Sequence, residues 1–268
     1  MIRELLRVEE IHGVAEEGTT EPIRCRLSDG HDAFVKYPNN RCGTPVLINE
    51  WVGNKVAKAI GVNTPDFGVC FLSKEVIELS MLDDELDDNN AGICFFSGYL
   101  HNTVPLKLWK SQGSRETAKI ILLDHILNNF DRNEGSLLYD IGMKKLYAID
   151  YSHIFSRGPK INYHTDYIKK GMTLEDYLYT EILYDNKKTY DQLALRWGYS
   201  EQTMRGEASH IKNGLSRGFF QSIFNDLPQE WSYMLDAEIV KKLVNFLTFR
   251  SSHINSICEM IIKERRSC

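Results

Sequence analysis

The apolar pattern of the chain changes near residue 100, and this change is the feature that most constrains the fold. Before it, short apolar runs separated by turn residues predict β-strands. The tightest turn, Ser28-Asp29-Gly30, lies between strand-like runs at 22–27 and 31–37 and predicts an antiparallel hairpin. After it, the apolar spacing becomes mostly helical. We therefore expect an α+β, bilobal fold with a β-rich N-lobe over residues 1–100 and a helical C-lobe over residues 101–268.

Composition and charge narrow the classes of function. The 268 residues are 43% apolar and carry 32 Lys and Arg against 37 Asp and Glu, so the formal net charge is −5. Such a charge does not favour a protein that coats nucleic acid. No apolar run approaches the ~18 residues that a membrane span needs. The six cysteines lack the paired spacing of disulfide frameworks and zinc sites, which indicates mostly buried thiols in a cytoplasmic protein.

A lysine and a glutamate occupy unusual positions in the β-rich part. Lys36 ends an apolar strand, and Glu50 lies on the apolar face of a helix predicted from Pro45 to Gly61, with Thr44 as its cap. A carboxylate on such a face needs a partner. A strand lysine that contacts nucleotide phosphates often pairs with a glutamate on the following helix. The alternative is an ordinary strand-edge lysine whose end extends into water.

The segment between the first two predicted strands, residues 12–20, is rich in glycine and hydroxyl residues. Gly18, Thr19 and Thr20 are candidates for binding phosphate through backbone N–H groups. The segment matches neither a Walker A loop nor a GxGxxG loop, so a plain turn is the alternative interpretation.

The most informative segment is the polar loop 129–136 together with the strand that ends at Asp150. Phosphoryl transfer from ATP requires a carboxylate that orients or deprotonates the acceptor hydroxyl, and oxygen ligands that hold Mg²⁺ against the phosphates. Asp131, Ser136 and Asp150 stand where this chemistry needs them, as a loop carboxylate, an oxygen ligand five residues later and a strand-end aspartate. The alternative is a polar turn with an aspartate that has no catalytic function.

In these residues the sequence resembles the HipA-like kinases, which are distant relatives of the phosphatidylinositide kinases within the protein-kinase-like fold. The most specific likeness is Asn-Phe-Asp-Arg-Asn at 129–133 followed by Ile-Asp-Tyr-Ser-His at 149–153. Two earlier parts also occur in the family order, namely Gly18–Pro22 with Val35-Lys36, and Asn49–Gly53 through Gly61-Val62. The resemblance covers about residues 10–158. The remainder of the chain resembles the family only in its helical character.

The resemblance implies an ATP- and Mg²⁺-dependent kinase that phosphorylates Ser or Thr of a protein substrate and has a regulatory protein as a further partner. It also implies the roles of individual residues. These are Lys36 at the nucleotide phosphates, Glu50 as the partner of Lys36, Ser97, Tyr99 and Leu100 at the adenine hinge, Asp131 as the catalytic carboxylate and Asp150 as a magnesium ligand.

Ser136 departs from the family pattern, which usually has asparagine at this position. A serine hydroxyl is shorter than an asparagine side chain and is a poorer metal ligand than an amide oxygen. An alternative function is therefore a nucleotide-binding pseudokinase that acts as a regulatory or interaction module.

A third function is suggested by residues 190–215. Their spacing predicts a helix, a turn that contains Gly198 and a second helix, as in DNA-binding helix-turn-helix units. The local excess of cations is modest, and helix pairs are common in the helical part of kinase-like folds. Nucleic acid is therefore not the expected partner.

Overall fold

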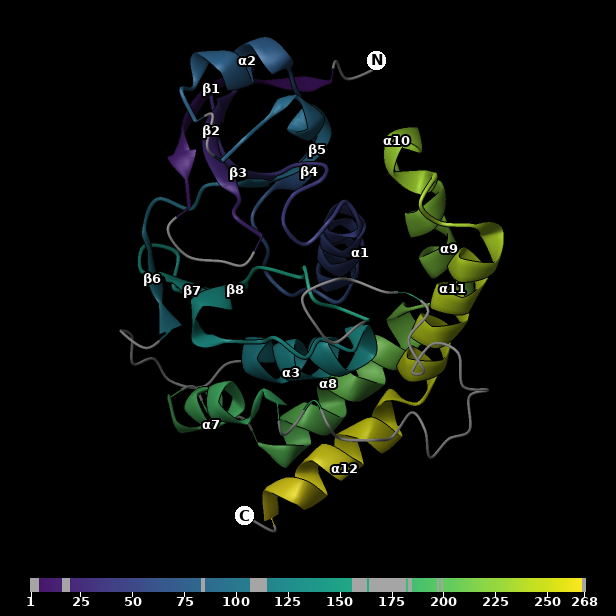
Figure 1. The fold of residues 1–268 in the computed structure, drawn as a ribbon. Helices are drawn as coiled ribbons and strands as arrows, with labels where there is room; N and C mark the ends of the chain where they lie inside the picture. The colour runs from purple at the N-terminus through teal and green to yellow at the C-terminus, as the bar shows by residue number, and fades with distance from the viewer. Residues whose placement is uncertain are drawn as a thin grey trace.

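The computed structural model describes residues 5–15, 20–82, 85–106, 115–155, 163, 182, 185–196, 198 and 200–266. Strands occupy the upper and left part of Figure 1, and most helices the lower and right part, which confirms the predicted α+β class. The described strands are β1 (Leu6–Val14), β2 (Ile23–Leu27), β3 (Asp32–Lys36), β4 (Phe67–Leu72), β5 (Gly92–Gly98), β6 (Thr103–Pro105), β7 (Leu137–Asp140) and β8 (Lys145–Ala148). The described helices are α1 (Pro45–Ala59), α2 (Lys74–Leu79), α3 (Arg115–Leu127), α7 (Lys187–Arg196), α8 (Glu201–Gly214), α9 (Arg217–Asn225), α10 (Gln229–Ser232), α11 (Ala237–Ser252) and α12 (Ile254–Arg266), with short 3-10 turns η1 (Asp88–Asn90) and η3 (Glu134–Ser136).

The first five strands close into a barrel in the order β1-β2-β3-β5-β4. β2 and β3 pair antiparallel, with Cys25 opposite Ala33, so the hairpin predicted around Ser28-Asp29-Gly30 is confirmed. β1 closes the barrel through a parallel pairing with β4, in which Leu6 lies opposite Cys70. Because successive side chains of a strand point to opposite faces, each strand contributes one row to the interior. The buried hydrophobic residues of β2 and β3 are Ile23, Cys25, Leu27, Ala33 and Val35.

Helix α1 begins at Pro45, where a missing N–H costs no helical hydrogen bond. It is followed by Gly61 in a left-handed conformation with a φ of 71°, which suits a helix end. Thr44 stands at the N-cap position, as predicted, but it does not cap the helix through its side chain. Its side chain makes no cap hydrogen bond, and its Oγ1 instead accepts one from the backbone N–H of Asn39.

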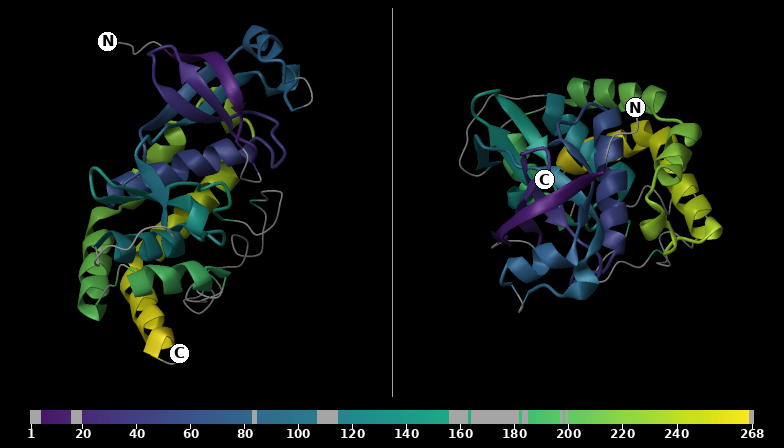
Figure 2. Two further views of the ribbon diagram at one scale, coloured as in Figure 1. Left: turned by 90° about the vertical axis from the view of Figure 1, so that its left-hand side faces the viewer. Right: turned by 90° about the horizontal axis from the view of Figure 1, so that it is seen from above.

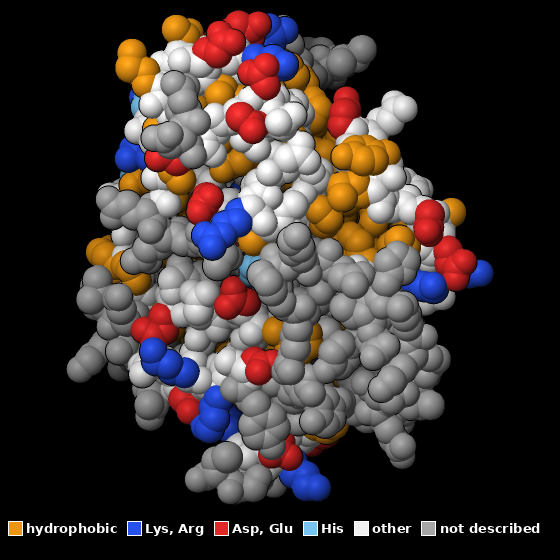
Figure 3. Space-filling model, in the orientation of Figure 1, with side chains coloured by type: hydrophobic (Ala, Val, Ile, Leu, Met, Phe, Trp, Pro, Cys, Tyr) orange, Lys and Arg blue, Asp and Glu red, His pale blue; other side chains and the backbone are white. Residues whose placement is uncertain are grey.

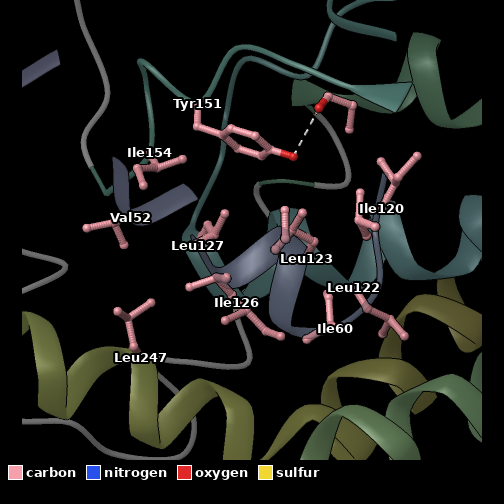
Figure 4. Close-up of a cluster of buried hydrophobic side chains, with 14 of the residues drawn as sticks. Val52, Ile60, Ile120, Leu122, Leu123, Ile126, Leu127, Tyr151, Ile154 and Leu247 are labelled. Atoms are coloured by element: carbon pink, nitrogen blue, oxygen red, sulfur yellow. Dashed lines mark hydrogen bonds between the residues drawn. The ribbon is translucent and has the colours of Figure 1, made fainter. Parts of the chain in front are cut away.

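The main hydrophobic core joins α1 to α3 and to the C-terminal helices (Figure 4). It contains Val52 and Ile60 from α1, Leu123 and Ile126 from α3, and Leu247 from α11, none of them more than 3% exposed. Helix α1 also contacts β5, α9 and α10. It is therefore enclosed between the barrel and the helical part of the chain, as Figure 2 shows.

Two tryptophans connect the C-terminal helices to α1 and to the barrel. Trp51 of α1 donates its Nε1–H to the carbonyl of Ile223 in α9 at 3.2 Å. Trp231 of α10 donates its Nε1–H to the carbonyl of Ile93 in β5 at 2.8 Å. Hydrophobic side chains gather on the surface at this junction, on the right of Figure 3. The division into two lobes at residue 100 stays a prediction, since helices of the second part pack directly on the first.

A second sheet, of order β6-β7-β8, lies between the barrel and α3 (Figure 1). β7 pairs antiparallel with both neighbours. The N–H of Ala148 donates to the carbonyl of Asn63, at 3.0 Å, and this bond ties β8 to the segment that follows α1. The residues that follow β8 therefore pass directly beside α1.

Of the described C-terminal helices, α7, α8, α11 and α12 contact α3, whereas α9 and α10 contact α1. The predicted helix pair forms as α7 and α8, with Gly198 in a left-handed conformation between them. Met204, Ala208 and Ile211 of α8 are buried, and this helix contacts α3 and α12. The last two helices, α11 and α12, are separated at His253, which caps the end of α11. Among the described helices, none combines the length and the apolar character of a membrane span.

Candidate active site

Lys36, the last residue of β3, lies at the centre of a cluster of polar side chains. Its Nζ donates hydrogen bonds to Glu50 Oε1 at 2.5 Å, to Asp150 Oδ1 at 3.0 Å and to Ser152 Oγ at 2.6 Å. The ion pair predicted between Lys36 and Glu50 is confirmed. The alternative of a lysine that extends into water is wrong, because only 9% of Lys36 is exposed.

In this cluster two carboxylates, of Glu50 and Asp150, form ion pairs with one ammonium group. Burial lowers the pKa of Lys36, but the charges of Asp150 and Glu50 outweigh burial, so the pKa lies above its usual value. Burial raises the pKa of Asp150, but Lys36 and a hydrogen bond from Ser152 bring this pKa below its usual value. Burial raises the pKa of Glu50, and Lys36 only partly opposes this. At neutral pH the lysine and Asp150 are therefore both charged.

The segment after β8 holds Glu50 in place. The backbone N–H of Tyr151 donates to Glu50 Oε1 at 3.0 Å, and Asn54 Nδ2 donates to Glu50 Oε2 at 3.2 Å. Gly53 allows this close packing, because a Cβ at residue 53 would lie 2.3 Å from the Cβ of Tyr151. A larger residue would push α1 away from the segment, so the position of Glu50 depends on glycine at 53.

Asp150 adopts a left-handed backbone conformation with a φ of 62°. This conformation costs a residue other than glycine on the order of 1–3 kcal/mol. Two hydrogen bonds from Ser152 to Asp150 Oδ1 stabilise it, from the backbone N–H at 3.2 Å and from Oγ at 2.7 Å. The Asp150 side chain remains 36% exposed, so its carboxylate stays accessible to a ligand.

Asp131 and Ser136 lie on the loop between α3 and β7, which Asn133 shapes. Asn133 Oδ1 accepts hydrogen bonds from the backbone N–H groups of Gly135 at 2.9 Å and Ser136 at 3.1 Å. Ser136 is buried, and its Oγ accepts from Arg132 Nη1 at 3.1 Å and from the Asn133 N–H at 3.2 Å. The same hydroxyl donates to the Asn133 carbonyl at 2.8 Å. The oxygen predicted as a metal ligand is thus bonded within its own loop.

A cavity of about 300 Å³ adjoins the Lys36 cluster. It is lined by Ala15, Thr20, Pro22, Phe34, Lys36, Glu50, Asn54, Phe95, Ser97, Asn133, Gly135, Ser136, Ile149 and Asp150. Six predicted site residues are in this lining: Thr20, Lys36, Glu50, Ser97, Ser136 and Asp150. Asp131, Tyr99 and Leu100 are not part of the lining. Gly18 and Thr19 lie outside the described residues.

The walls of the cavity differ in chemistry. Phe34, Phe95 and Ile149 are apolar, whereas Lys36 and Asp150 carry charge. Apolar walls with a few polar groups are typical of small-molecule sites, and an ammonium group suits phosphate. Carboxylate oxygens are the hard ligands that Mg²⁺ prefers. The residues present therefore fit a nucleotide, with Asp150 as the accessible oxygen ligand for a magnesium ion.

Sequence reasoning did not assign roles to several residues of the site. Ser152 stands two residues after Asp150 in the most specific stretch of the sequence, and this short spacing could have indicated a role for it in the site. Asn54 follows Glu50 by one helical turn, on the same face. Asp124 interrupts an apolar helix, so it needed a buried partner in the same way as Glu50 did, and that partner is Arg132, which bonds Ser136.

The comparison with protein families gives the family of the chain. The profile of the HipA-like kinases matches residues 8–257, so the chain belongs to the HipA-like kinase family. A search of the curated proteins found no match.

Solved structures support a kinase-like fold. The Helicobacter pylori proinflammatory kinase CtkA matches with a TM-score of 0.56 and 12% identity, over 94% of this chain and 95% of that chain. The Golgi casein kinase matches with a TM-score of 0.53 and 11% identity, over 94% of this chain and 72% of that chain. A structure of the Golgi casein kinase with Mn/ADP bound has a TM-score of 0.50 and 10% identity, over 94% and 73%. At these identities the likeness concerns the fold alone.

Proposed function

We propose that the protein is an ATP- and Mg²⁺-dependent kinase that phosphorylates Ser or Thr of a protein substrate. The observation that carries this proposal is Lys36 held between Glu50 and Asp150 at the edge of a cavity with apolar walls. Membership of the HipA-like kinase family supports the same reaction class. In this proposal the adenine lies against Phe34 and Ile149, near Ser97, and the phosphates lie toward Lys36.

Each polar residue then has a separate task. Lys36 binds phosphate oxygens, and Glu50 keeps the ammonium group in place. Asp150 holds Mg²⁺, which when bound neutralises charge that develops on the transferred phosphoryl group. Asp131 orients the acceptor hydroxyl and accepts its proton as the oxygen attacks the γ-phosphorus and ADP leaves. Desolvation and the charge of Asp150 raise the pKa of Asp131, which makes its carboxylate a better base.

A pseudokinase that binds nucleotide without efficient transfer is the second candidate. The geometry of Ser136 favours it, because the hydroxyl that takes the place of the usual metal ligand is bonded to Arg132 and to the backbone of Asn133. By contrast, DNA binding gains no support from α8. Arg205, a cation on the exposed face of this helix, is ion-paired with Glu201 and Glu259.

Intact-mass measurement after incubation with Mg²⁺ and ATP, together with assays of ADP release and ADP binding, tests the two candidates. A kinase gains 80 mass units per phosphate or releases ADP in proportion to enzyme, and an Asp131→Asn control does neither. Nucleotide binding without mass gain or turnover would support the pseudokinase. A wild-type chain that binds no nucleotide would contradict both proposals.

A further inference from the structure

Arg132 and Asp124 form an ion pair with no exposed surface on either side chain. Arg132 Nε lies 3.1 Å from Asp124 Oδ1 and 3.2 Å from Oδ2, and Arg132 Nη2 lies 3.0 Å from Oδ1. Removing two charges from water is costly, so a buried pair is by itself a weak source of stability. What the pair holds in place is therefore more informative than the pair itself.

The remaining nitrogen of the guanidinium, Nη1, bonds to two parts of the candidate active site. It donates to the carbonyl of Ile149 at 2.7 Å and to the carbonyl of Ser136 at 3.3 Å. Ile149 immediately precedes Asp150, and Arg132 itself immediately follows Asp131. One planar group thus connects the loop that carries one carboxylate to the strand end that carries the other.

The other end of the pair is fixed by its own hydrogen bonds. Asp124 accepts from Asn129 Nδ2 at 2.9 Å and from the hydroxyl of Tyr190, in α7, at 3.1 Å. Asn186 Oδ1 accepts from the backbone N–H of Arg132 at 2.9 Å. These bonds fix the carboxylate of Asp124 and the backbone of Arg132. The orientation of the guanidinium is therefore set by α3 and by the start of α7.

We propose that Arg132 is a positioning residue that sets the separation between the carboxylates of Asp131 and Asp150. The proposal rests on the kinase function proposed above. A lysine cannot replace it, because a guanidinium has five N–H donors in a planar fork, whereas an ammonium group has three at one point. A shift of about 1 Å in a catalytic group lowers a rate by about 100-fold.

Two variants test this role. Arg132→Lys keeps a cation beside Asp124 but cannot also reach Ile149 and Ser136. The double variant Arg132→Met with Asp124→Asn removes both charges, so that no buried charge is left without a partner. Arg205→Met is the matched control, because it makes the same change in an arginine whose side chain is 44% exposed.

Both test variants are expected to fold and to show a kcat about 100-fold below that of the wild type, with a KM for ATP within about threefold. The magnesium concentration at half-maximal rate is expected to rise, because Asp150 loses its anchor. The control should match the wild type in all three quantities. A folded test variant whose kcat lies within threefold of the wild-type value would overturn the proposal.

Amide hydrogen exchange tests the role without any need for activity. The Ile149 N–H donates to the Ser136 carbonyl at 3.0 Å, and this bond should open more often in the double variant. We expect exchange at residues 149–152 to become about tenfold faster, while the amides of β2 and β3 keep their rates. If the wild-type chain neither binds nucleotide nor transfers phosphate, the proposed function fails and exchange alone decides. Unchanged exchange at residues 149–152 would then overturn the positioning role.

Discussion

The indole rings of Trp51 and Trp231 pack edge to face, with their centroids 6.4 Å apart. Trp51 belongs to α1, the helix that carries Glu50, whereas Trp231 belongs to α10 and is hydrogen-bonded to β5. Helix α1 is therefore held by a contact that bridges it to the barrel. The C-terminal helices thus contribute to the candidate site without reaching its cavity.

Replacement of Trp231 tests this support. Trp231→Ala removes a side chain that is 1% exposed, and we expect it to lower the free energy of unfolding by about 3–5 kcal/mol. It should also weaken ADP binding, since α1 loses a contact. Tyr233→Ala is the matched control, because this aromatic residue is 75% exposed and its loss should change stability by about 0.5 kcal/mol or less. Urea denaturation measures the free energy of unfolding of both variants. Equal losses of this free energy in the two variants would count against the role of Trp231.

A methyl group at residue 53 should damage the site through α1. Gly53→Ala places a Cβ against Tyr151, and overpacking of this kind costs about 1–3 kcal/mol of stability. If α1 moves to relieve the clash, Glu50 moves too, and ADP affinity falls by about tenfold. Gly206→Ala is the control, since a Cβ there meets nothing within 4 Å and should stabilise α8 by about 0.5–1 kcal/mol. Unchanged ADP affinity in a folded Gly53→Ala variant would show that the helix can adjust without moving Glu50.

Asp131 and Asp150 are expected to differ in what their loss removes. Asp131→Asn should lower the rate of transfer by about 10²–10⁴-fold and leave ADP binding nearly intact, because its proposed task is acceptor orientation. Asp150→Asn should lose the part of ADP binding that depends on Mg²⁺, because its carboxylate is the accessible metal ligand. Calorimetric titration with and without Mg²⁺ separates the two. Identical binding curves for both variants would show that the division of roles is wrong.

Ser136→Asn tests whether the unusual residue limits activity. Mg²⁺ needs oxygen ligands at about 2.0–2.1 Å, and the Ser136 hydroxyl is shorter than an asparagine side chain and already bonded within its loop. The variant should therefore transfer phosphate faster and need less magnesium at half-maximal rate. A magnesium titration of ATP turnover on both proteins provides the measurement. If the rate stays the same or falls, other residues hold the metal or the site serves binding alone.

Burial of His125 makes stability depend on pH. Its Nδ1 donates to the Ile121 carbonyl at 2.8 Å, and burial lowers the pKa of His125 from 6.5 to about 3. Between these values the unfolded chain binds a proton that the folded chain does not, so stability falls as the pH falls. The contribution of this residue should decrease by about 2 kcal/mol between pH 7 and pH 5. Urea denaturation at pH 7 and pH 5 gives the change in the free energy of unfolding, and this change should be smaller by the same amount in His125→Leu. An equal change in both proteins would contradict the role given to His125.

Local signals in the sequence were sufficient for part of the fold and of the site. The Asp29-Gly30 turn and Pro45 act over a few residues, so the β2–β3 hairpin and the start of α1 could be predicted. The pair of Lys36 and Glu50 could be predicted because a carboxylate on an apolar helix face requires a cation. The physical reason in each case lies within one element or between two neighbouring elements.

Other features depend on contacts between distant parts of the chain. The closure of the barrel joins β1 to β4, and nothing near Leu6 indicates a parallel partner at Cys70. The sequence suggests that the Ser136 hydroxyl faces a metal. It does not reveal the hydrogen bond from Arg132 to this hydroxyl, because that bond depends on how the loop folds back on itself. Thr44 has the residue type of a helix cap, but a competing local bond to Asn39 takes its hydroxyl.

The closed barrel also affects how the protein meets other chains. In an open sheet the outer strands leave a row of unpaired backbone groups, to which a foreign strand can add. Each of the five strands of the barrel has a partner on both sides, but β1 pairs with β4 only at Leu6 and Arg7. In the described part of the chain, only the sheet β6-β7-β8 has outer strands. Strand addition is therefore blocked at β2, β3 and β5, and within the barrel only the parts of β1 and β4 beyond their two shared pairs leave backbone groups for it.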